Sequence, residues 1–566
     1  MTPDNSKVQA VQEWPRPRDA NEVRQFIGLA SYYRKYVQHF ADIARSLHRL
    51  TQKETTYCWT EECKQAFRNL MTKLIEAPIL AYPTFQKEPD QPQYPVNIQA
   101  IPRRARCTIA RVLAIIQESG PPLGLNINIA KCELFSSRDL SSFPEEMRRS
   151  NVPHFEILGA PIGDLVFCAK FVAQKQSEGV DRDENCASSS IDPQVALLLL
   201  RQCGSFCRLV HLARNTPPLL INEAFALFDD CVQQCFSECT AVDASAATWQ
   251  QAQLSLKRGG LGLRSLSFHS SAAYIASFLS SGLSPSSGRY ISSSLHLYNS
   301  LVDPQDSITH ESVGDSPLSQ KVLSSKIEDQ QFNNLFHNAS VTDRARLLSI
   351  SSPHASAWLS VTPSPRLNLH LEPAEFQVAL KWWLGIPVVQ GQSCPHCPSC
   401  VLDDFGHHSL TCKHGVDVVS RHNKLKDVFY DFCKRACLGP RLELGCGAGS
   451  DSQSRPADVL VPNWDLGKPA AFDLSVTSTL QSSALLEASV TAGSAALFAE
   501  NRKHNNSDKK CDELGWACIP LVVETYGCWG AEAVAALSEL AGHLSVRNNE
   551  PKSKTIFSLY SRLGLN

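Results

Sequence analysis

The chain has 566 residues, too many for one hydrophobic core, so about three domains are expected. Hydrophobic residues make up 43% and charged residues 19% of the chain, and we find no apolar run of transmembrane length, which argues against a membrane partner. The net charge of −2 excludes a uniformly basic nucleic-acid binder, so any such binding must come from local patches.

The start of the chain, "MTPDNSKVQA", is polar and has no apolar segment, so we expect no secretory signal and a nuclear or cytoplasmic location. In such a compartment the 21 cysteines are expected to be thiols or metal ligands rather than a disulfide framework.

Two amphipathic helices are predicted near the N-terminus. The first follows a capping box formed by Asp19 and Glu22, and its apolar residues recur on one face as far as Phe40. The second begins after Thr60, the expected N-cap, and ends at Pro78.

The phrases "KVQAVQEWPRP", "FIGLASYYRKYV", "ADIARSLHRLTQK", "YCWTEECKQAF" and "LIEAPILAYPTF" follow one another over residues 7–85. This series resembles the reverse transcriptase thumb and connection of gypsy-class LTR retrotransposons. The resemblance implies that residues 1–98 are a remnant of that region. The strand that carries the first RNase H aspartate in the family does not follow, so RNase H activity is predicted absent.

Residues 103–270 change character. "GPPLGLNINIAKCELF" and "PHFEILGAPIGD" resemble the segment after the catalytic loop of non-LTR (LINE-like) reverse transcriptases, and residues 191–264 resemble its helical thumb. The resemblance assigns the turn at Leu158 and Gly159 to the primer grip. The two families meet at a junction within residues 86–106.

Polymerase activity is predicted absent, because it needs carboxylates that hold two magnesium ions. The sequence contains two Asp-Asp pairs. Asp229-Asp230 lies in an amphipathic helical pattern and Asp403-Asp404 in a Cys/His-rich loop, and neither pair is flanked by apolar strands.

Serine dominates residues 271–330, which we interpret as a linker in which a helix remains an alternative. Residues 331–393 are expected to form a helical segment leading into the last domains. Its adjacent tryptophans, Trp382 and Trp383, favour core anchors over base stacking.

A zinc knuckle is predicted over residues 394–414, in "SCPHCPSCVLDDFGHHSLTC". Three thiolates and one imidazole in a short loop can bind one structural Zn²⁺ tetrahedrally. The expected ligands are Cys394, Cys397, His407 and Cys412. Cys400 and His408 remain alternatives, because each is close enough in sequence to substitute.

Residues 415–545 show the order helix, three strands, helix, strand, which is that of the restriction-enzyme-like nuclease core. Residues 546–566 are interpreted as a tail. In the strand "AFDLSV", Phe472 and Leu474 are expected to face the core. Asp473 then faces the other way and can meet Asp458 of the preceding strand. Two carboxylates on adjacent strands can hold Mg²⁺ against a phosphodiester.

The Arg-Pro-x-Asp…Asp phrase after a Cys-Cys-His-Cys knuckle resembles the C-terminal endonuclease of site-specific non-LTR retrotransposons. The resemblance assigns the metal-binding pair to Asp458 and Asp473. The lysine expected two residues after the second aspartate is Ser475 here, which nominates Lys503 on the next helix. Glu443 is a weaker candidate for a further metal ligand, and the candidacy of Glu524 is weaker still.

Together these features predict a multidomain α+β protein. Helical reverse transcriptase remnants precede a small zinc site and an α/β restriction-like (PD-(D/E)xK type) nuclease core. The expected function is a retrotransposon-derived fragment with residual Mg²⁺-dependent DNA nicking, with structural zinc, with DNA or RNA as partners and with no small-molecule substrate. The alternatives are a non-catalytic nucleic-acid-binding relic and the translation of a decayed locus that does not fold as a unit.

Overall fold

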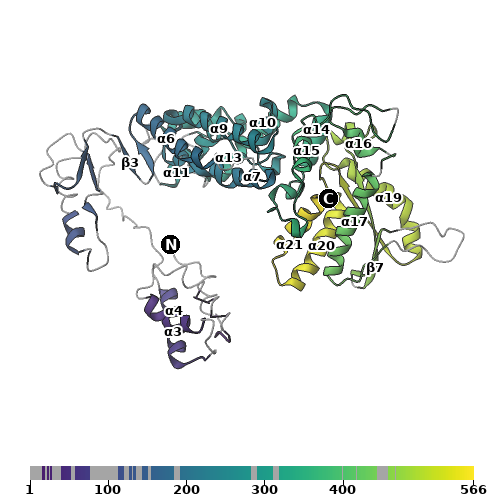
Figure 1. The fold of residues 1–566 in the computed structure, drawn as a ribbon, viewed down its shortest axis with the longest axis horizontal. Coiled ribbons are helices and arrows are strands. Elements are labelled where there is room, and N and C mark those ends of the chain that lie inside the picture. The colour runs from purple at the N-terminus through teal and green to yellow at the C-terminus, as the bar shows by residue number, and fades with distance from the viewer. Residues whose placement is uncertain are drawn as a thin grey trace. The chain divides into compact units, whose positions relative to one another are not determined.

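The computed structural model describes most of the chain from residue 143 onward and separate short stretches before it (Figure 1). The described residues are 16–19, 22–23, 26–27, 40–51, 58–76, 113–119, 121, 127–129, 132–135, 143–150, 154–157, 159–183, 191–281, 290–309, 318–397, 400–412, 414–415, 417–442, 457–465 and 467–565. The chain divides into two compact units, Met1–Tyr94 and Pro95–Asn566, which are described separately.

The N-terminal unit contains helices α3 (Phe40–Arg49) and α4 (Glu61–Glu76). The predicted cap of α4 is confirmed, since the hydroxyl of Thr60 accepts a hydrogen bond from the backbone N–H of Cys63 at 3.4 Å. Asp19 likewise accepts one from the N–H of Glu22 at 2.8 Å. Apolar side chains from both helices and from the segment before α3 share one small core: Val23, Phe26, Ile27, Ala44, Leu47, Leu50, Cys63, Ala66, Phe67 and Leu70.

In the described part of the second unit, a helical stretch at residues 113–119 is followed by two small pairs of strands. Strand β1 (Glu133–Phe135) pairs in parallel with β2 (Arg148–Ser150). Strand β3 (Phe155–Ile157) forms an antiparallel hairpin with β4 (Ala160–Ile162), and the turn between them contains Gly159 at a φ of 80°. Glycine adopts this left-handed conformation without the steric cost of a Cβ atom.

A helical region follows the hairpin. Its longer helices are α6 (Leu165–Asp183), α7 (Pro193–Leu199), α8 (Phe206–Asn215), α9 (Pro218–Thr240), α10 (Ala246–Gln253), α11 (Leu266–Ser280), α12 (Ile291–Asn299), α13 (Gln320–Asn338), α14 (Val341–Ile350) and α15 (Pro373–Leu384). A π-helical turn (Leu200–Gly204) links α7 to α8, and the short helix α16 (His407–Thr411) follows later in the chain.

The interpretation of residues 271–330 as a linker is wrong for the described part of that segment, which contains most of α11, all of α12 and the start of α13. Serine favours helix packing here because its small side chain lets helices approach, as at the buried Ser271 and Ser294. Its hydroxyl also bonds back to its own helix: Ser294 donates to the carbonyl of Tyr290 at 2.9 Å.

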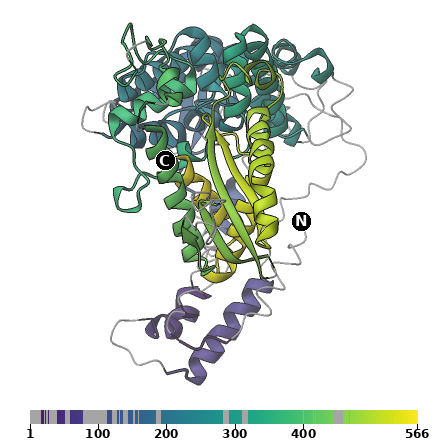
Figure 2. The same ribbon diagram turned by 90° about the vertical axis from the view of Figure 1, so that its right-hand side faces the viewer.

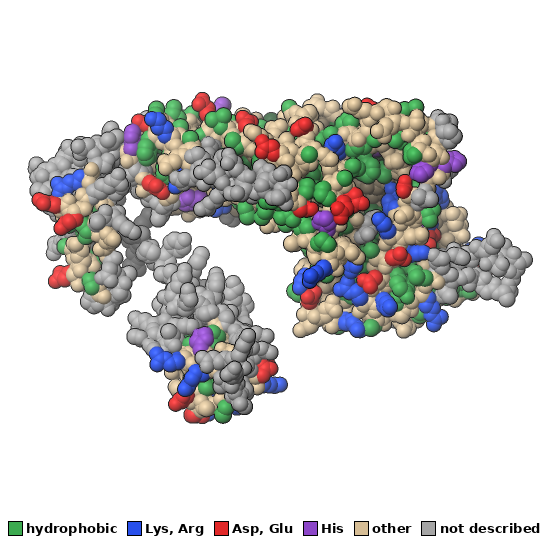
Figure 3. Space-filling view, viewed as in Figure 1, with side chains coloured by type: hydrophobic (Ala, Val, Ile, Leu, Met, Phe, Trp, Pro, Cys, Tyr) green, Lys and Arg blue, Asp and Glu red, His purple; other side chains and the backbone are tan. Residues whose placement is uncertain are grey.

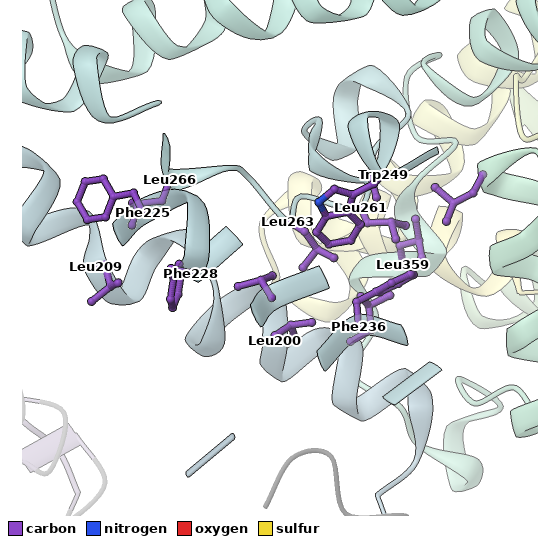
Figure 4. Close-up of a cluster of buried hydrophobic side chains, with 14 of the residues drawn as sticks. Leu200, Leu209, Phe225, Phe228, Phe236, Trp249, Leu261, Leu263, Leu266 and Leu359 are labelled. Carbon is purple, nitrogen blue, oxygen red and sulfur yellow. The ribbon is translucent and has the colours of Figure 1, made fainter. Parts of the chain in front are cut away.

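One hydrophobic core takes side chains from helices α6 to α11 and from α13, α14 and α15 (Figure 4), and a second cluster joins α12 to α11 and to the first turns of α13. Figure 4 shows the side chains of Phe225, Phe228 and Phe236 along α9, with leucines from several neighbouring segments around them. Trp383 is buried in this core and its indole N–H donates to the carbonyl of Gly260 at 3.3 Å. The preference for a core anchor over base stacking is therefore confirmed for Trp383.

Among the described residues, Pro193–Asn215 is the one helical stretch long and apolar enough to cross a membrane by length and composition alone. In the structure this stretch is α7, the π-helical turn and α8, and several of its leucines pack in the helical core. A core helix passes the same test, so the stretch is weak evidence for a membrane span.

The C-terminal region is a four-stranded mixed sheet covered by helices. Its elements in chain order are α17 (Asp417–Arg435), β5 (Arg441–Leu442), β6 (Val459–Asp465), β7 (Lys468–Thr477), α18 (Leu485–Ala488), α19 (Ser494–Glu513), β8 (Ala517–Glu524), α20 (Ala531–Asn548) and α21 (Lys552–Gly564). The strands lie in the order β5-β6-β7-β8. The contacts β5–β6 and β6–β7 are antiparallel, and β7–β8 is parallel.

The sheet lies between two helical layers (Figure 2). On one face, α17, α20 and α21 pack on apolar side chains of β6, β7 and β8 and form the larger core. On the other face, α19 packs through Ala496 and Ala499 on Val522, and through Cys511 on a second small cluster. Residues on β7 that face α19 therefore lie in the thinner, less apolar layer.

Two local features of this region follow from glycine and proline. The helix predicted between the last two strands of this region is interrupted before α19 at Gly493, which has a φ of 77°. Pro520 lies in β8, which is an edge strand of the sheet, the place where a residue without a backbone N–H is best tolerated.

Candidate metal centres

Asp458 directly precedes β6, and its backbone N–H donates to the carbonyl of Phe472 on β7 at 2.9 Å. This bond fixes Asp458 beside the middle of β7. Its carboxylate accepts a hydrogen bond from the N–H of Leu474 at 2.8 Å, and its other oxygen lies 3.3 Å from Nε2 of His422 on α17. The carboxylate is thus oriented by the backbone of the neighbouring strand and by one imidazole.

Asp473 lies at the centre of β7, between the core residues Phe472 and Leu474. Because side chains alternate along a strand, its carboxylate faces the layer of α19. There its Oδ1 atom lies 2.5 Å from Nζ of Lys503, which also reaches the carbonyl of Leu474 at 3.4 Å. Three predicted residues, Asp458, Asp473 and Lys503, therefore meet on one face of the sheet.

The two carboxyl groups differ electrostatically. Burial raises the pKa of Asp473; the ammonium of Lys503 opposes this rise, and the carboxylate of Asp458 adds to it. Burial acts in the same direction on Asp458, but the hydrogen bond from His422 and the N–H of Leu474 outweigh it and lower the pKa of Asp458. Two adjacent carboxylates in a half-buried site, one of them paired with a lysine, can attract and bind a cation.

Of the two weaker candidates, Glu524 does not join this group. Glu443 lies outside the described residues. Glu524 is the last residue of β8 and pairs with Thr477 on β7. Thr477 is four residues beyond Asp473, so Glu524 lies about 13 Å farther along the sheet. It is 2% exposed and accepts a hydrogen bond from the N–H of Ala496 at 3.2 Å, so it anchors the start of α19. His422 was not predicted, although its helical position before the apolar stripe of α17 could have suggested it.

A second group gathers three thiols and one imidazole. The ligand atoms of Cys394, Cys397, His408 and Cys412 all lie within 4.8 Å of one another, and the three cysteines are buried. The sulfurs of Cys394 and Cys412 are 3.8 Å apart. Zinc–sulfur bonds of about 2.3 Å at tetrahedral angles separate two sulfurs by about 3.8 Å, so the spacing fits a shared Zn²⁺.

The histidine of this group is His408, the alternative in the sequence analysis, and not His407. Consecutive residues of a helix point about 100° apart, so α16 can direct only one of the two imidazoles toward the thiols. His407 instead lies with its Nε2 3.0 Å from the hydroxyl of Tyr526 and its Nδ1 3.3 Å from Asp403. Cys400, the other alternative, packs against the cysteine cluster.

Both Asp-Asp pairs have a member with a structural role. Asp229 is buried on α9 and accepts hydrogen bonds from the N–H groups of Leu266 and Ser267 and from the hydroxyl of Ser265, which caps the start of α11. Asp403 accepts the backbone N–H groups of the turn that leads into α16.

The chain was compared with families and proteins of known sequence. No family model matches it. It is 41% identical over 88 residues to the retrovirus-related Pol polyprotein from transposon 412 of Drosophila melanogaster, a match that covers 16% of this chain and 7% of that protein. It is 36% identical over 83 residues to an uncharacterized mitochondrial protein of Arabidopsis thaliana, covering 15% of this chain and 52% of that protein.

A third relative is the Gag-Pol polyprotein of baboon endogenous virus, 36% identical over 87 residues that cover 15% of this chain and 5% of that protein. The chain thus spans about half of one of these relatives and less than a tenth of the other two. Its relatives over this stretch of about 90 residues include retrotransposon Pol polyproteins, and the chain therefore carries a retrotransposon Pol-derived segment.

Proposed function

We propose that the chain is a retrotransposon-derived Pol fragment whose C-terminal α/β region is a metal-dependent endonuclease that nicks DNA. The observation that carries this proposal is the meeting of Asp458, Asp473 and Lys503, which come from separate elements of the fold. The element order of residues 415–545 and the mixed sheet are also those expected of a restriction-like nuclease core, which we assign to this region.

The donor set fits a hard divalent cation. Asp458 and Asp473 supply carboxylate oxygens, the ligands that magnesium prefers, and their side chains are 21% and 19% exposed, so a cation can be reached from solvent. Magnesium held there would act as a Lewis acid on a phosphodiester.

The protein's own groups would position the reactants. The N–H of Leu474 and the imidazole of His422 hold the carboxylate of Asp458 in one orientation. Lys503 now neutralises Asp473, and with a phosphate in the site its ammonium is placed to orient an attacking water or to stabilise developing charge. Neither role requires a lysine two residues after Asp473, where this chain has Ser475.

We also propose a structural zinc ion held by Cys394, Cys397, His408 and Cys412. The three thiols are buried, and the four side chains would fill all four tetrahedral positions of zinc. A site with no open position for a substrate is typical of structural zinc. The metal would fix the loop between α15 and α17, which leads directly into the proposed nuclease.

DNA or RNA is the proposed partner, bound through local basic patches. In Figure 3, Lys and Arg side chains are frequent over the part of the C-terminal region where Figure 1 places α17, α20 and α21. Exposed basic residues of these helices are Lys424, Lys434, Arg435, Arg547, Lys552 and Lys554. Such side chains contact phosphates and make binding salt-dependent.

Nicking of supercoiled plasmid by the full chain with Mg²⁺ or Mn²⁺ tests the activity. We expect Asp458→Ala and Asp473→Ala to abolish nicking with the fold retained, because both carboxylates face away from the larger core. Lys503→Ala should slow nicking less completely, since a lysine orients groups but does not anchor the metal. Asp512→Ala, an exposed residue on the same helix as Lys503, is the matched control and should cleave like the wild type.

A wild-type chain that folds but never nicks DNA with either metal would overturn the endonuclease. So would nicking that survives Asp458→Ala and Asp473→Ala, because it would then come from elsewhere.

The second candidate is a non-catalytic nucleic-acid-binding protein, and a basic hollow in the helical region favours it. The hollow has a volume of about 430 Å³ and is lined by Arg201, Lys257 and Arg264 together with the ring of Phe206. Cations beside an aromatic ring suit phosphate and base contacts. Lys257→Glu should weaken binding of single-stranded DNA and reduce its salt dependence, and unchanged binding in this variant would remove the hollow from consideration.

A further inference from the structure

After Lys503, one face of α19 carries three residues of types that bind metals. His504, Asp508 and Cys511 are spaced by four and three residues, which places them on the same side of a helix. The chain turns at Gly515 and enters β8, whose second residue is Cys518. The sequence motif is therefore His-x3-Asp-x2-Cys-x6-Cys, across a helix end and the following strand.

The side chains of these four residues form one connected group. The ligand atoms of His504, Asp508 and Cys518 all lie within 4.8 Å of one another, and Nδ1 of His504 is 2.7 Å from Oδ1 of Asp508. The thiol of Cys518 also interacts with the thiol of Cys511 and with the carboxylate of Asp508. Neither cysteine is in a disulfide.

We propose that His504, Asp508, Cys511 and Cys518 form a second metal site, of the zinc class. Two thiolates, an imidazole and a carboxylate are a donor set that selects zinc over magnesium or calcium. Tetrahedral zinc holds its ligand atoms about 3.3–3.8 Å apart, so side-chain rotations would close His504, Asp508 and Cys518, whose ligand atoms lie within 4.8 Å, around the ion. The thiol of Cys511 would turn in as the fourth ligand.

A carboxylate outside the group supports the assignment. Nε2 of His504 lies 2.6 Å from Oε1 of Glu532, at the start of α20. Histidine ligands commonly donate their second ring N–H to a carboxylate, which fixes the ring and strengthens the metal bond. With Nδ1 on the metal, the contact to Glu532 would supply this partner.

A metal here would join the C-terminal end of α19 to the first residues of β8. It lies on the same helix as Lys503, and so would restrain the helix that supplies the lysine of the proposed nuclease. The site is independent of the cluster of Cys394, Cys397, His408 and Cys412, which no residue of this group joins.

The test uses the full chain, purified under reducing conditions, stripped with chelator and reloaded with Zn²⁺ or Co²⁺. Cys511→Ser/Cys518→Ser should bind about one equivalent less zinc than the wild type, whatever the other cluster holds. It should also lose part of the thiolate-to-cobalt charge-transfer absorption. Cys231→Ser/Cys437→Ser replaces two exposed cysteines far from the group in sequence and should bind as the wild type does.

A variant that keeps all four ligands guards against a double serine variant that fails to fold. Glu532→Gln should lower the zinc affinity about 10–100-fold, the usual effect of removing the carboxylate behind a histidine ligand. In the wild type, zinc should also protect Cys518, which is partly exposed, from alkylation, and leave Cys231 reactive.

Equal zinc content in the wild type and a folded Cys511→Ser/Cys518→Ser variant would overturn the site. If that variant does not fold, unchanged affinity in Glu532→Gln together with unprotected Cys518 overturns it. A Cys511–Cys518 disulfide that forms in air without any metal uptake under reducing conditions would assign the pair to redox chemistry instead, and would equally overturn the proposal.

Discussion

At the scale of single residues, the sequence predicts which side chains can meet but not which of two neighbours does so. Alternation along a strand is enough to place Asp473 on the other face of the sheet from Phe472 and Leu474, and the structure has this arrangement. Spacing in a loop carries no such rule. His407 and His408 differ by one residue, and the choice between them depends on how α16 is set by its contacts with Asp403 and Tyr526.

The two histidines give a matched pair of variants for the zinc proposal. His408→Ala should lower zinc affinity and the thermal unfolding midpoint, because it removes the imidazole beside the three thiols. His407→Ala should leave zinc content unchanged, since that ring contacts Tyr526 and Asp403. Zinc content by elemental analysis and the unfolding midpoint are the measurements. Loss of zinc in His407→Ala alone would reverse the assignment.

A pH dependence follows from Asp473. Burial and the nearby Asp458 carboxylate raise its pKa despite Lys503, so the protonated form persists above the usual carboxyl range. Protons compete with a cation for this group. Binding of Mn²⁺ should therefore strengthen as pH rises through this raised pKa and weaken as pH falls. Calorimetric titration over a series of pH values measures it, and a midpoint at or below the ordinary aspartate pKa of about 3.9 would contradict the explanation.

At the scale of helices and strands, periodicity predicts α17 and the strands of the C-terminal region but not α20. The interpretation of residues 546–566 as a tail is wrong, because α21 packs in the larger core through Leu559, Tyr560 and Leu563. In the helical region, composition is misleading. The order of α17, β6, β7 and β8 follows from their apolar patterns. The composition of the serine-rich segment predicts a linker because serine is common in solvated segments, and this prediction is wrong. Here serines cap helices, as Ser319 caps α13, or fit between them, and only tertiary packing reveals this.

The cap of α11 supports a stability prediction. Asp229→Ala would leave the buried N–H of Leu266 and that of Ser267 without their acceptor, at a cost of about 1–3 kcal/mol. The neighbouring Asp230 is exposed, so Asp230→Ala should change stability by less than about 0.5 kcal/mol. Urea unfolding followed by far-UV circular dichroism compares the two. Equal midpoints would show that the cap contributes little.

The motif His-x3-Asp-x2-Cys-x6-Cys illustrates the limit of reading one element at a time. Its helical part has the spacing of a single face, which periodicity alone could have revealed. The fourth residue, Cys518, joins the group because β8 runs parallel to β7, so that the first residues of β8 lie next to the C-terminal end of α19. Glu532 comes from a third element.

At the scale of the whole molecule, the structure combines a small N-terminal helical unit with a larger unit in which a helical region and an α/β region follow one another. The division between Tyr94 and Pro95 falls within the segment 86–106, where the two family resemblances meet. The similarity to Pol polyproteins covers about 90 residues, so most of the chain lies outside it.

The last prediction concerns templated synthesis by the full chain. A polymerase holds two magnesium ions with carboxylates on strands, and the two Asp-Asp pairs of this chain are placed otherwise. Asp229 caps α11 from within a helix, and Asp403 holds the turn before α16. We therefore expect no extension of a primed RNA or DNA template with Mg²⁺ or Mn²⁺ above a heat-inactivated control. Extension that is lost in Asp458→Ala/Asp473→Ala would assign both reactions to one metal site, whereas extension that persists there would require a polymerase centre built from other residues of the chain.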